Sequence, residues 1–494
     1  MRLVGIVAAI GGVIALLLLA PWPSSGGDSR ATDPPDEAVA AGGLRAATPT
    51  STAIPPTPTP LPPTPTPTPD PIAWAVLTDA LDRRDWTEAT QVYDRNATEI
   101  DARGRDTFVG LSHAFADEYP TRLRHVDQLI VERDFTGSMH ELDRLLQWYP
   151  ERPQLVDRHE AATEWSTQLD FSEPWTESIP HLFIHSLIVD YDKVFDGDYT
   201  DAGYREFMIT RLEFTRALEQ LHDNDFILID VHDLYRETDD GLEPTPLIVP
   251  AGKRPLVFSI DDVSYYSYMA TDGFPDRLAI DRDLNVATVM IRDDGTETLT
   301  LDGDAMPILD RFVWDNPDFS LGGAKGIIAL TGYEGVFGYD ISEDQSDKPD
   351  FADRVEHATV VAERLRELGW DFASHSYTHD NALQSPTVSY GRFVHDSDRW
   401  NRDINPVLGG VDLYISPFGF DLRDNNPRLR YLIDDMGFNA FMPISSDTEM
   451  TWGDGYLRMY RTALDGFMLL QAPQLLAPYL DADTVLDEAR FEGP

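Results

Sequence analysis

From Ile179 onward, short apolar runs alternate with amphipathic stretches, and no other feature of the sequence limits the possible folds as much. Buried strands that are joined through helices form parallel sheets or barrels with the helices outside. The expected strands are Leu182–Ile184, Phe226–Ile229, Leu256–Ile260, Gly326–Thr331, Phe372–Ser374, Leu413–Ser416 and Phe467–Leu470. The expected helices are Tyr204–Asn224, Ala352–Leu368 and Pro427–Met436. The sequence therefore predicts an α/β domain over residues 171–494.

An insertion at about residues 264–325 interrupts this alternation. Three short extended runs lie between Arg277 and Leu301, and turn residues join them at Asp283-Leu284-Asn285 and at Asp294-Gly295. Extended runs with turns between them indicate an antiparallel β-meander.

The chain before the α/β domain divides into three parts. Residues 1–27 hold a basic start and a long apolar run, typical of a cleaved signal peptide or an uncleaved signal-anchor. Residues 28–71 are rich in Pro and Thr, which predicts a disordered, extended stalk. This order predicts that most of the chain lies at the extracellular face of the cell membrane, or is secreted.

Residues 72–170 have helical periodicity and few strand signals. The phrase Arg84-Asp85-Trp86 returns in related form as Arg133-Asp134-Phe135, which resembles the elbows of tetratricopeptide-like hairpins. We expect a small all-α region that is either a spacer or a binding module, with no protein partner indicated.

Composition excludes several function classes. The chain has 86 acidic and 39 basic residues, so its net charge of −47 repels phosphate and no nucleic-acid partner is expected. There is no cysteine, which excludes disulfides, thiolate metal sites and a cysteine nucleophile. Any metal site must therefore use histidine and carboxylate ligands.

Two groups of polar residues follow expected strands. Asp261 and Asp262 end the run Leu256–Ile260, and adjacent buried carboxylates require a cation or a shared proton. His375 and His379 follow the run Phe372–Ser374. Each pattern alone is common on protein surfaces, but two imidazoles and a carboxylate at strand ends favour a catalytic metal site with positions open for water.

These residues resemble the motifs of the polysaccharide deacetylases (carbohydrate esterase family four, the NodB homology domain). Ser259-Ile260-Asp261-Asp262 is similar to the first motif, and His375-Ser376-Tyr377-Thr378-His379 to the second. Ile415-Ser416-Pro417-Phe418-Gly419 is similar to the third, and Ile179–Ser186 to the first-strand phrase of extracellular members. The chain departs from the family in three places: Val263 replaces a glycine, the third motif has no arginine, and the fifth-motif histidine is absent if Met468-Leu469-Leu470-Gln471 is the corresponding strand.

The resemblance implies a distorted (β/α) barrel and metal-assisted removal of acetyl groups from sugars. Asp262, His375 and His379 would hold a divalent metal, with Zn²⁺ expected, and Asp261 would be the general base. Pro417, Phe418 and Gly419 would line the substrate groove, with the Phe418 N–H at the oxyanion. Aromatic residues available to the sugar are Tyr265, Tyr266, Trp452 and Tyr456.

Two roles lack their usual residue. His185 is a possible substitute for the missing acid, or a structural histidine. Arg458 or Arg461 could replace the missing arginine, or both could be surface ion-pair partners.

The function expected first is a metal-dependent hydrolase that removes acetyl groups from an N-acetylated cell-envelope or extracellular polysaccharide. The N-terminal segment would tether it to the membrane. The alternatives are a catalytically impaired glycan-binding protein that retains the barrel, and an O-acetyl esterase acting on polysaccharide. A glycoside hydrolase with paired carboxylates would leave the two histidines unexplained.

Overall fold

The computed structural model describes residues 76, 79, 119–149, 152–238, 241–385, 388–445 and 450–491. The predicted export segment (1–27), the stalk (28–71) and most of residues 72–118 lie outside this set. Within the described part, no helix is both long enough and apolar enough to cross a membrane.

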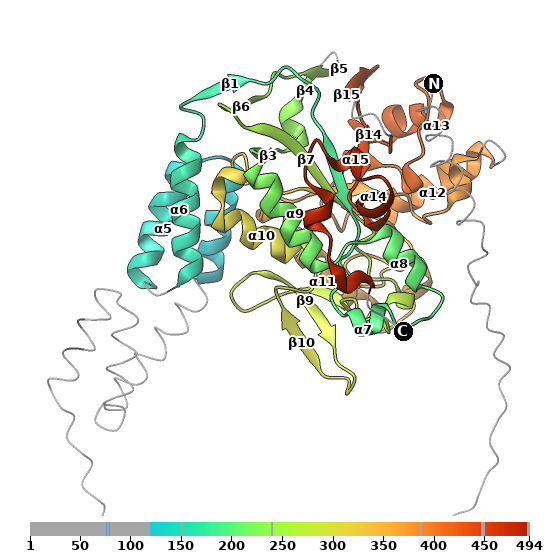
Figure 1. Cartoon of the computed structure of the whole chain (residues 1–494), viewed down its shortest axis with the longest axis horizontal. Coiled ribbons are helices and arrows are strands. Elements are labelled where there is room, and N and C mark those ends of the chain that lie inside the picture. Colours follow the sequence, from blue (N-terminus) through green and yellow to red (C-terminus); the bar gives the residue numbers. More distant parts are fainter. Residues whose placement is uncertain are drawn as a thin grey trace, which may run out of the picture. The chain divides into compact units, whose positions relative to one another are not determined.

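The described chain is a mixed α/β structure built on a ten-stranded sheet (Figure 1). The strand order is β15-β16-β14-β13-β12-β11-β7-β2-β17, and β3 pairs with β7 off this path. All pairings are parallel except that of β15 with β16. The strands are β2 (His181–Ile184), β3 (Phe226–Leu228), β7 (Arg254–Asp261), β11 (Ile327–Leu330), β12 (Asp371–Ser374), β13 (Leu413–Ile415), β14 (Ala440–Met442), β15 (Met450–Gly453), β16 (Tyr456–Met459) and β17 (Arg461–Ala463). The predicted α/β class with a parallel sheet is confirmed, and the closed barrel stays a prediction.

Alternate side chains of the central strands enter two different apolar clusters. Phe258 and Ile328 join the large cluster formed with the helices. Val257 and Ile327, one residue earlier on the same strands, join a smaller cluster that includes Leu413 and Met442. Because successive side chains of a strand point to opposite faces, both faces of this sheet are buried. Near-continuous apolar runs follow from that double burial.

The segment after β14 is linked to β17, although these strands are far apart in the strand order. Beyond β14, Ile444 forms an isolated parallel bridge with Arg461, the first residue of β17. The Arg461 N–H also donates to the Pro443 carbonyl at 2.9 Å. The segment that follows β14 is therefore bonded to β17, the last strand of the order.

Two of the three predicted helices differ from the prediction. The helices are α5 (Phe135–Trp148), α6 (Pro153–Thr167), α7 (Tyr191–Val194), α8 (Asp201–Phe207), α9 (Arg211–Asp223), α10 (Ala305–Asp315), α11 (Phe351–Glu367), α12 (Tyr390–Asp403), α13 (Pro427–Arg430), α14 (Gly466–Gln471), α15 (Pro473–Leu476) and α16 (Ala482–Val485). The predicted helix over 204–224 is two helices, because Thr210 and Glu213 form a capping box that starts α9. The predicted helix over 427–436 continues from α13 as a π-helical segment, Tyr431–Asp435. The helix over 352–368 is confirmed as α11.

The predicted strand Phe467–Leu470 is wrong, because these residues lie in helix α14. Asp465 caps this helix, since its carboxylate accepts the Met468 N–H at 2.8 Å. Four apolar residues suit a buried strand and a short buried helix equally, so periodicity could not separate the two. The last strand parallel to β2 is β17 instead.

The predicted meander is confirmed. Strands β8 (Arg277–Ile280), β9 (Val286–Ile291) and β10 (Glu297–Thr300) form an antiparallel sheet (Figure 1, yellow). Helix α10 then leads back to β11 and was not predicted. Two small antiparallel pairs complete the structure: β1 (Ser172–Pro174) with β6 (Ile248–Pro250), and β4 (Tyr235–Thr238) with β5 (Gly241–Pro244).

The helical region is joined to the α/β region through a buried charge network. Residues 119–131 are helical and precede α5 and α6. Asp127 accepts from Arg158 of α6 at 2.6 Å and from Arg364 of α11 at 2.6 Å. Arg133-Asp134-Phe135 forms the turn before α5, with Asp134 as its cap. The related phrase at Arg84 lies outside the described residues, so the repeat stays a prediction.

Candidate metal centre

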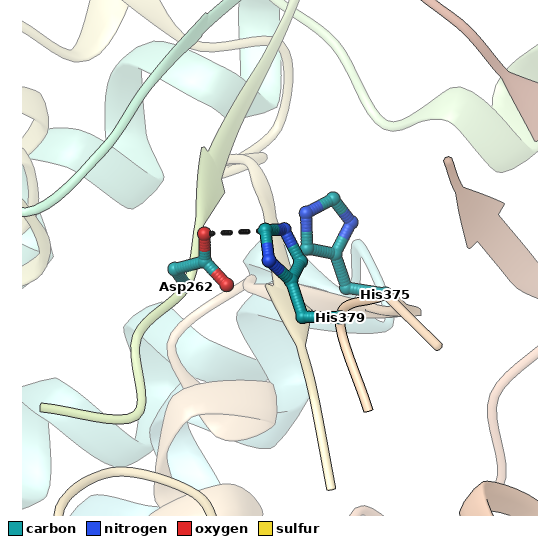
Figure 2. A group of neighbouring side chains, drawn as sticks. All are labelled: Asp262, His375 and His379. Carbon is teal, nitrogen blue, oxygen red and sulfur yellow. Dashed lines mark ion pairs between the residues drawn. The ribbon is translucent and has the colours of Figure 1, made fainter. Parts of the chain in front are cut away.

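Asp262, His375 and His379 come together at the carboxyl edge of the sheet. Asp262 directly follows β7 and His375 directly follows β12. One ligand atom from each residue lies within 4.8 Å of the others. His379 Nε2 is 3.7 Å from Asp262 Oδ2, and the two imidazole rings are 5.0 Å apart. Figure 2 shows the carboxylate and the two rings facing one another.

The backbone at this edge is strained. Ten described non-glycine residues have positive φ, and five of them lie in the loops around the three ligands. These five are Asp262, Tyr265, Ser376, His379 and Phe418, with φ between 46° and 61°. Such conformations cost about 1–3 kcal/mol each and persist where the surrounding structure holds them. Their concentration here indicates a functional site.

The donor set fits a divalent transition metal. His375 Nδ1 lies 2.8 Å from the Ile415 carbonyl, so Nδ1 carries the proton and Nε2 is the ligand atom. Burial lowers the pKa of His375 to about 4, although Asp261 and Asp262 oppose this, so the ring is neutral. Burial raises the pKa of Asp262, but the histidines and a hydrogen bond from Tyr266 outweigh it, so the carboxylate is ionised. One carboxylate and two imidazoles are the ligands of many zinc sites.

Asp261 has different surroundings from its neighbour. It is 3% exposed, and its Oδ2 lies 3.8 Å from His375 Nε2. Arg461 Nη1 donates to both of its carboxylate oxygens, at 2.8 and 3.0 Å. Burial alone would raise the pKa of Asp261, but Arg461 and His375 together lower it to about 2. The structure therefore places a second carboxylate, ionised at neutral pH, beside the candidate metal ligands.

The structure distinguishes the two arginines that the sequence left open. Arg461 is fully buried on β17, and its guanidinium lies 4.2 Å from the Phe183 ring centre. Arg458 instead binds Asp421, the Leu422 carbonyl and Asp424, and so holds the loop that follows Gly419. Of these two arginines, Arg461 is the one that contacts Asp261.

Of the expected substrate residues, Phe418 lies closest to the histidines. Its half-buried ring is 4.4 Å from the His379 ring. Pro417 and Gly419 are buried, and a Cβ on Gly419 would lie 2.4 Å from the Ile444 side chain. Gly419 therefore serves the close packing of this loop.

The four aromatic residues expected near the sugar are not all at this edge. Tyr265 is buried and donates to Asp304 at 2.7 Å. Tyr456 begins β16 and Trp452 pairs beside it on β15, so both lie at the opposite, amino edge of the sheet. Tyr266 is also buried, and its hydroxyl donates to Asp262 Oδ1 at 2.7 Å. Sequence reasoning missed this support of a ligand; its only signal was a tyrosine four residues after the aspartate.

His185 follows β2, and Asp465 occupies the matching place after β17. Phe183 pairs with Ala463, so the next matching positions in this parallel register are His185 and Asp465. His185 Nδ1 lies 3.0 Å from the Phe207 carbonyl. Burial raises the pKa of Asp465 to about 6. The expected fifth-motif position, Gln471, lies at the end of helix α14 and not in the sheet.

Comparisons with known proteins give only distant structural similarity. No family model and no curated protein matches the sequence. Among solved structures, the chain is similar to the deacetylase domain of BpsB from Bordetella bronchiseptica, with 14% identity over 58% of this chain and 96% of that one. The TM-score is 0.30, which is too low to carry weight for fold or reaction. Function must therefore be inferred from the residues of this chain.

Proposed function

We propose that this protein is a metal-dependent hydrolase that removes acetyl groups from an N-acetylated polysaccharide. The observation that carries the proposal is the pairing of two carboxylates with different partners at one strand end. Asp262 faces His375 and His379, whereas Asp261 is buried against Arg461. A site that only holds a metal has no need of a second ionised carboxylate beside the ligands.

The scaffold of the proposed enzyme is a distorted (β/α) barrel. The bridge between Ile444 and Arg461 supports it, because it bonds the segment after β14 to β17, across the gap that closing a barrel would span. The separate apolar cluster around Val257, Leu413 and Met442 also supports it, since a barrel encloses one face of its strands.

Asp262, His375 and His379 would hold the metal, proposed as Zn²⁺. A divalent ion at this place would lower the pKa of a water molecule and polarise the acetyl carbonyl. Asp261 takes the proton from the attacking water. Arg461 keeps this carboxylate ionised and aligned, because its Nη1 donates to both carboxylate oxygens.

Phe418 and His185 supply the remaining steps. The Phe418 N–H, held in a loop with left-handed backbone, donates to the developing oxyanion. His185 protonates the leaving amine from Nε2, because Nδ1 is engaged by the Phe207 carbonyl. General acid catalysis is typically worth about 10²–10⁴ in rate.

The test is acetate release from acetylated chito-oligosaccharide and from peptidoglycan, with and without chelator. We expect Asp261→Asn to lose about 10²–10⁴-fold in rate and to keep its metal. Asp310→Asn is the matched control, because Asp310 is similarly buried but bonds Trp370 at 2.9 Å, away from the ligands. Turnover that survives chelation, or an active Asp261→Asn, would contradict the mechanism.

Two other outcomes identify the alternatives. Metal binding and glycan binding without acetate release would indicate the impaired glycan-binding protein. Release of acetate from O-acetylated polysaccharide alone would indicate the esterase, whose alkoxide leaving group needs less help from an acid.

The proposed place of action is the extracellular face of the cell membrane, or the medium. The apolar run of residues 1–27 and the Pro/Thr-rich residues 28–71 support it. The acetylated polysaccharide is then the partner, and the N-terminal segment is the membrane contact. Fractionation of cells with an antibody to the α/β domain tests this, and recovery in the cytoplasmic fraction would overturn it.

A further inference from the structure

Tyr268, Tyr266 and Tyr333 form a row of aromatic rings, and the middle one, Tyr266, contacts a candidate metal ligand. Tyr266 donates its hydroxyl to Asp262 Oδ1 at 2.7 Å. On one side its ring stacks with Tyr268, with centres 5.7 Å apart and an interplanar angle of 14°. On another side it meets Tyr333 at 5.5 Å and 35°. The buried Tyr266 thus connects the metal ligands to a ring that is 47% exposed, that of Tyr333.

The loop that carries Tyr333 is anchored on several sides. It follows β11, and the N–H groups of Gly332 and Tyr333 both donate to the Tyr377 carbonyl, at 3.0 and 2.7 Å. The carboxylate of Glu334 accepts from the Ser267 N–H at 2.5 Å and from its hydroxyl at 3.1 Å. Glu334 has a φ of 54°. An exposed ring on so firmly held a loop has little entropy to lose when a ligand packs on it.

Packing within the protein accounts for only part of the row. Tyr266 and Tyr268 belong to the apolar cluster around Phe195, Tyr204 and Phe274. Tyr333 is not part of this cluster and keeps nearly half of its surface in water. Its exposure beside the candidate active site calls for a ligand with a flat apolar face and polar edges.

We infer that Tyr333 is a subsite for a sugar ring of the glycan chain next to the acetylated residue, supported from behind by Tyr266 and Tyr268. The inference rests on the proposed function, because it identifies the substrate as a chain of pyranose rings. The C–H face of such a ring packs on an aromatic face, and its hydroxyls stay free for water and neighbouring polar groups. The half-buried Glu334 beside Tyr333 and the buried Asp272 near Tyr268 disfavour an acidic sugar here. The favoured ligand is therefore an uncharged glycan.

The inference is tested by binding, without turnover. The dissociation constants of the disaccharide and the hexasaccharide of N-acetylglucosamine are measured by calorimetry on the full chain carrying Asp261→Asn, with and without Tyr333→Ala. We expect Tyr333→Ala to weaken hexasaccharide binding about 3- to 10-fold, the range typical of one aromatic contact. The preference for the longer chain should shrink accordingly. Tyr333→Phe should bind like the parent, and Tyr333→Leu should not, because a flat ring is required.

Phe171→Ala is the control, since Phe171 is 85% exposed and directly precedes β1, away from the candidate site. Equal hexasaccharide affinity in the parent and Tyr333→Ala would overturn the subsite. Failure of the deacetylase proposal has a different signature: intact hexasaccharide binding that depends on Tyr333, together with no acetate release by the wild type. Thermal melts of each variant show whether the fold is kept.

Discussion

Asp261 and Asp262 are adjacent in the chain, yet their side chains have different partners. Asp261 ends the alternation of β7, so it shares a face with Val257 and Ser259 and is buried against Arg461. Asp262 has a φ of 61°, which turns the chain out of the strand and toward the histidines. One change in backbone conformation thus separates a candidate base from a candidate ligand.

Arg461 determines the state of Asp261, so its removal should change the pH dependence of turnover. In Arg461→Gln the buried carboxylate loses its cation, and burial then raises its pKa above the wild-type value of about 2. We expect the acid limb of the pH–rate profile to move to higher pH, and each pH unit of that movement means about a tenfold loss of rate below the limb. Arg461→Lys keeps a charge and should shift the limb less. Identical profiles for all three proteins would show that Arg461 does not act through Asp261.

The neutrality of His375 makes stability depend on pH. Its pKa is about 4 in the folded protein and 6.5 ordinarily, so between these values the unfolded chain binds a proton that the folded protein does not. The free energy of unfolding of chelated protein should therefore fall as pH is lowered from about 6.5 to 4, by up to about 1.4 kcal/mol per pH unit from this group. Urea unfolding at pH 7 and pH 5 measures it. His375→Asn should lose less between the two pH values, and an equal loss would contradict the assignment.

At the scale of elements, the loop after β13 is held by a glycine and an arginine. Gly419 has a φ of 65° and lies against the Ile444 side chain. Gly409, in the loop before β13, has a similar φ of 79°, but a Cβ added there would meet only the Arg366 side chain, at 3.7 Å. Arg458 binds the loop beyond Gly419. The backbone conformation at Phe418 therefore depends on the packing of its neighbour Gly419 against Ile444, which follows β14.

Alanine at the two glycines should separate backbone strain from crowding. Gly409→Ala should cost about 1 kcal/mol for the left-handed backbone. Gly419→Ala should cost about 1–3 kcal/mol more, since its Cβ would overlap Ile444. Denaturant unfolding of both variants measures the difference. Equal costs would mean that Ile444 moves aside freely.

The buried carboxylate of Asp127 joins the helical region to the α/β region, and its loss should cost much of the free energy of unfolding. Asp127 is 1% exposed and serves Arg158 and Arg364, which come from α6 and α11. Asp127→Ala leaves the buried Arg158 without its ion-pair partner and Arg364 with Glu367 alone, and it should lower the free energy of unfolding by about 3–5 kcal/mol. Asp350→Ala is the control, because Asp350 is an exposed carboxylate that precedes α11 and pairs with Arg354 of that helix. Its loss should lower the free energy of unfolding much less. A small loss in Asp127→Ala would show that water reaches the network.

For the whole molecule, the candidate ligands follow strands β7 and β12, which are distant in the chain and have only β11 between them in the sheet. A metal that binds only the folded protein stabilises it by mass action, by about 4 kcal/mol at a thousand times its dissociation constant. Chelation should therefore lower the melting temperature, and Zn²⁺ should restore it. His379→Ala should abolish the response. His395→Ala, which removes an exposed histidine of α12, should keep it; loss of the response in both variants would indicate non-specific binding.

Much of the sheet was predictable because its central strands are buried on both faces. The apolar runs ending before Asp261 and before His375 became β7 and β12. The run Phe467–Leu470 was misassigned, because its identity depends on the cap at Asp465 and on the place that β17 already occupies beside β2. Helix α10 was hidden inside the insertion, after the meander.

By itself, the sequence determined the α/β class, the strand ends that carry carboxylates and histidines, and the absence of thiol ligands. These properties depend on residue type and local periodicity, which a linear chain displays directly. Only the tertiary structure decided that Arg461 meets Asp261, that Tyr266 supports Asp262, and that Tyr333 is the exposed ring of the row. Those contacts depend on strand order, register and burial, which arise when distant segments pack together.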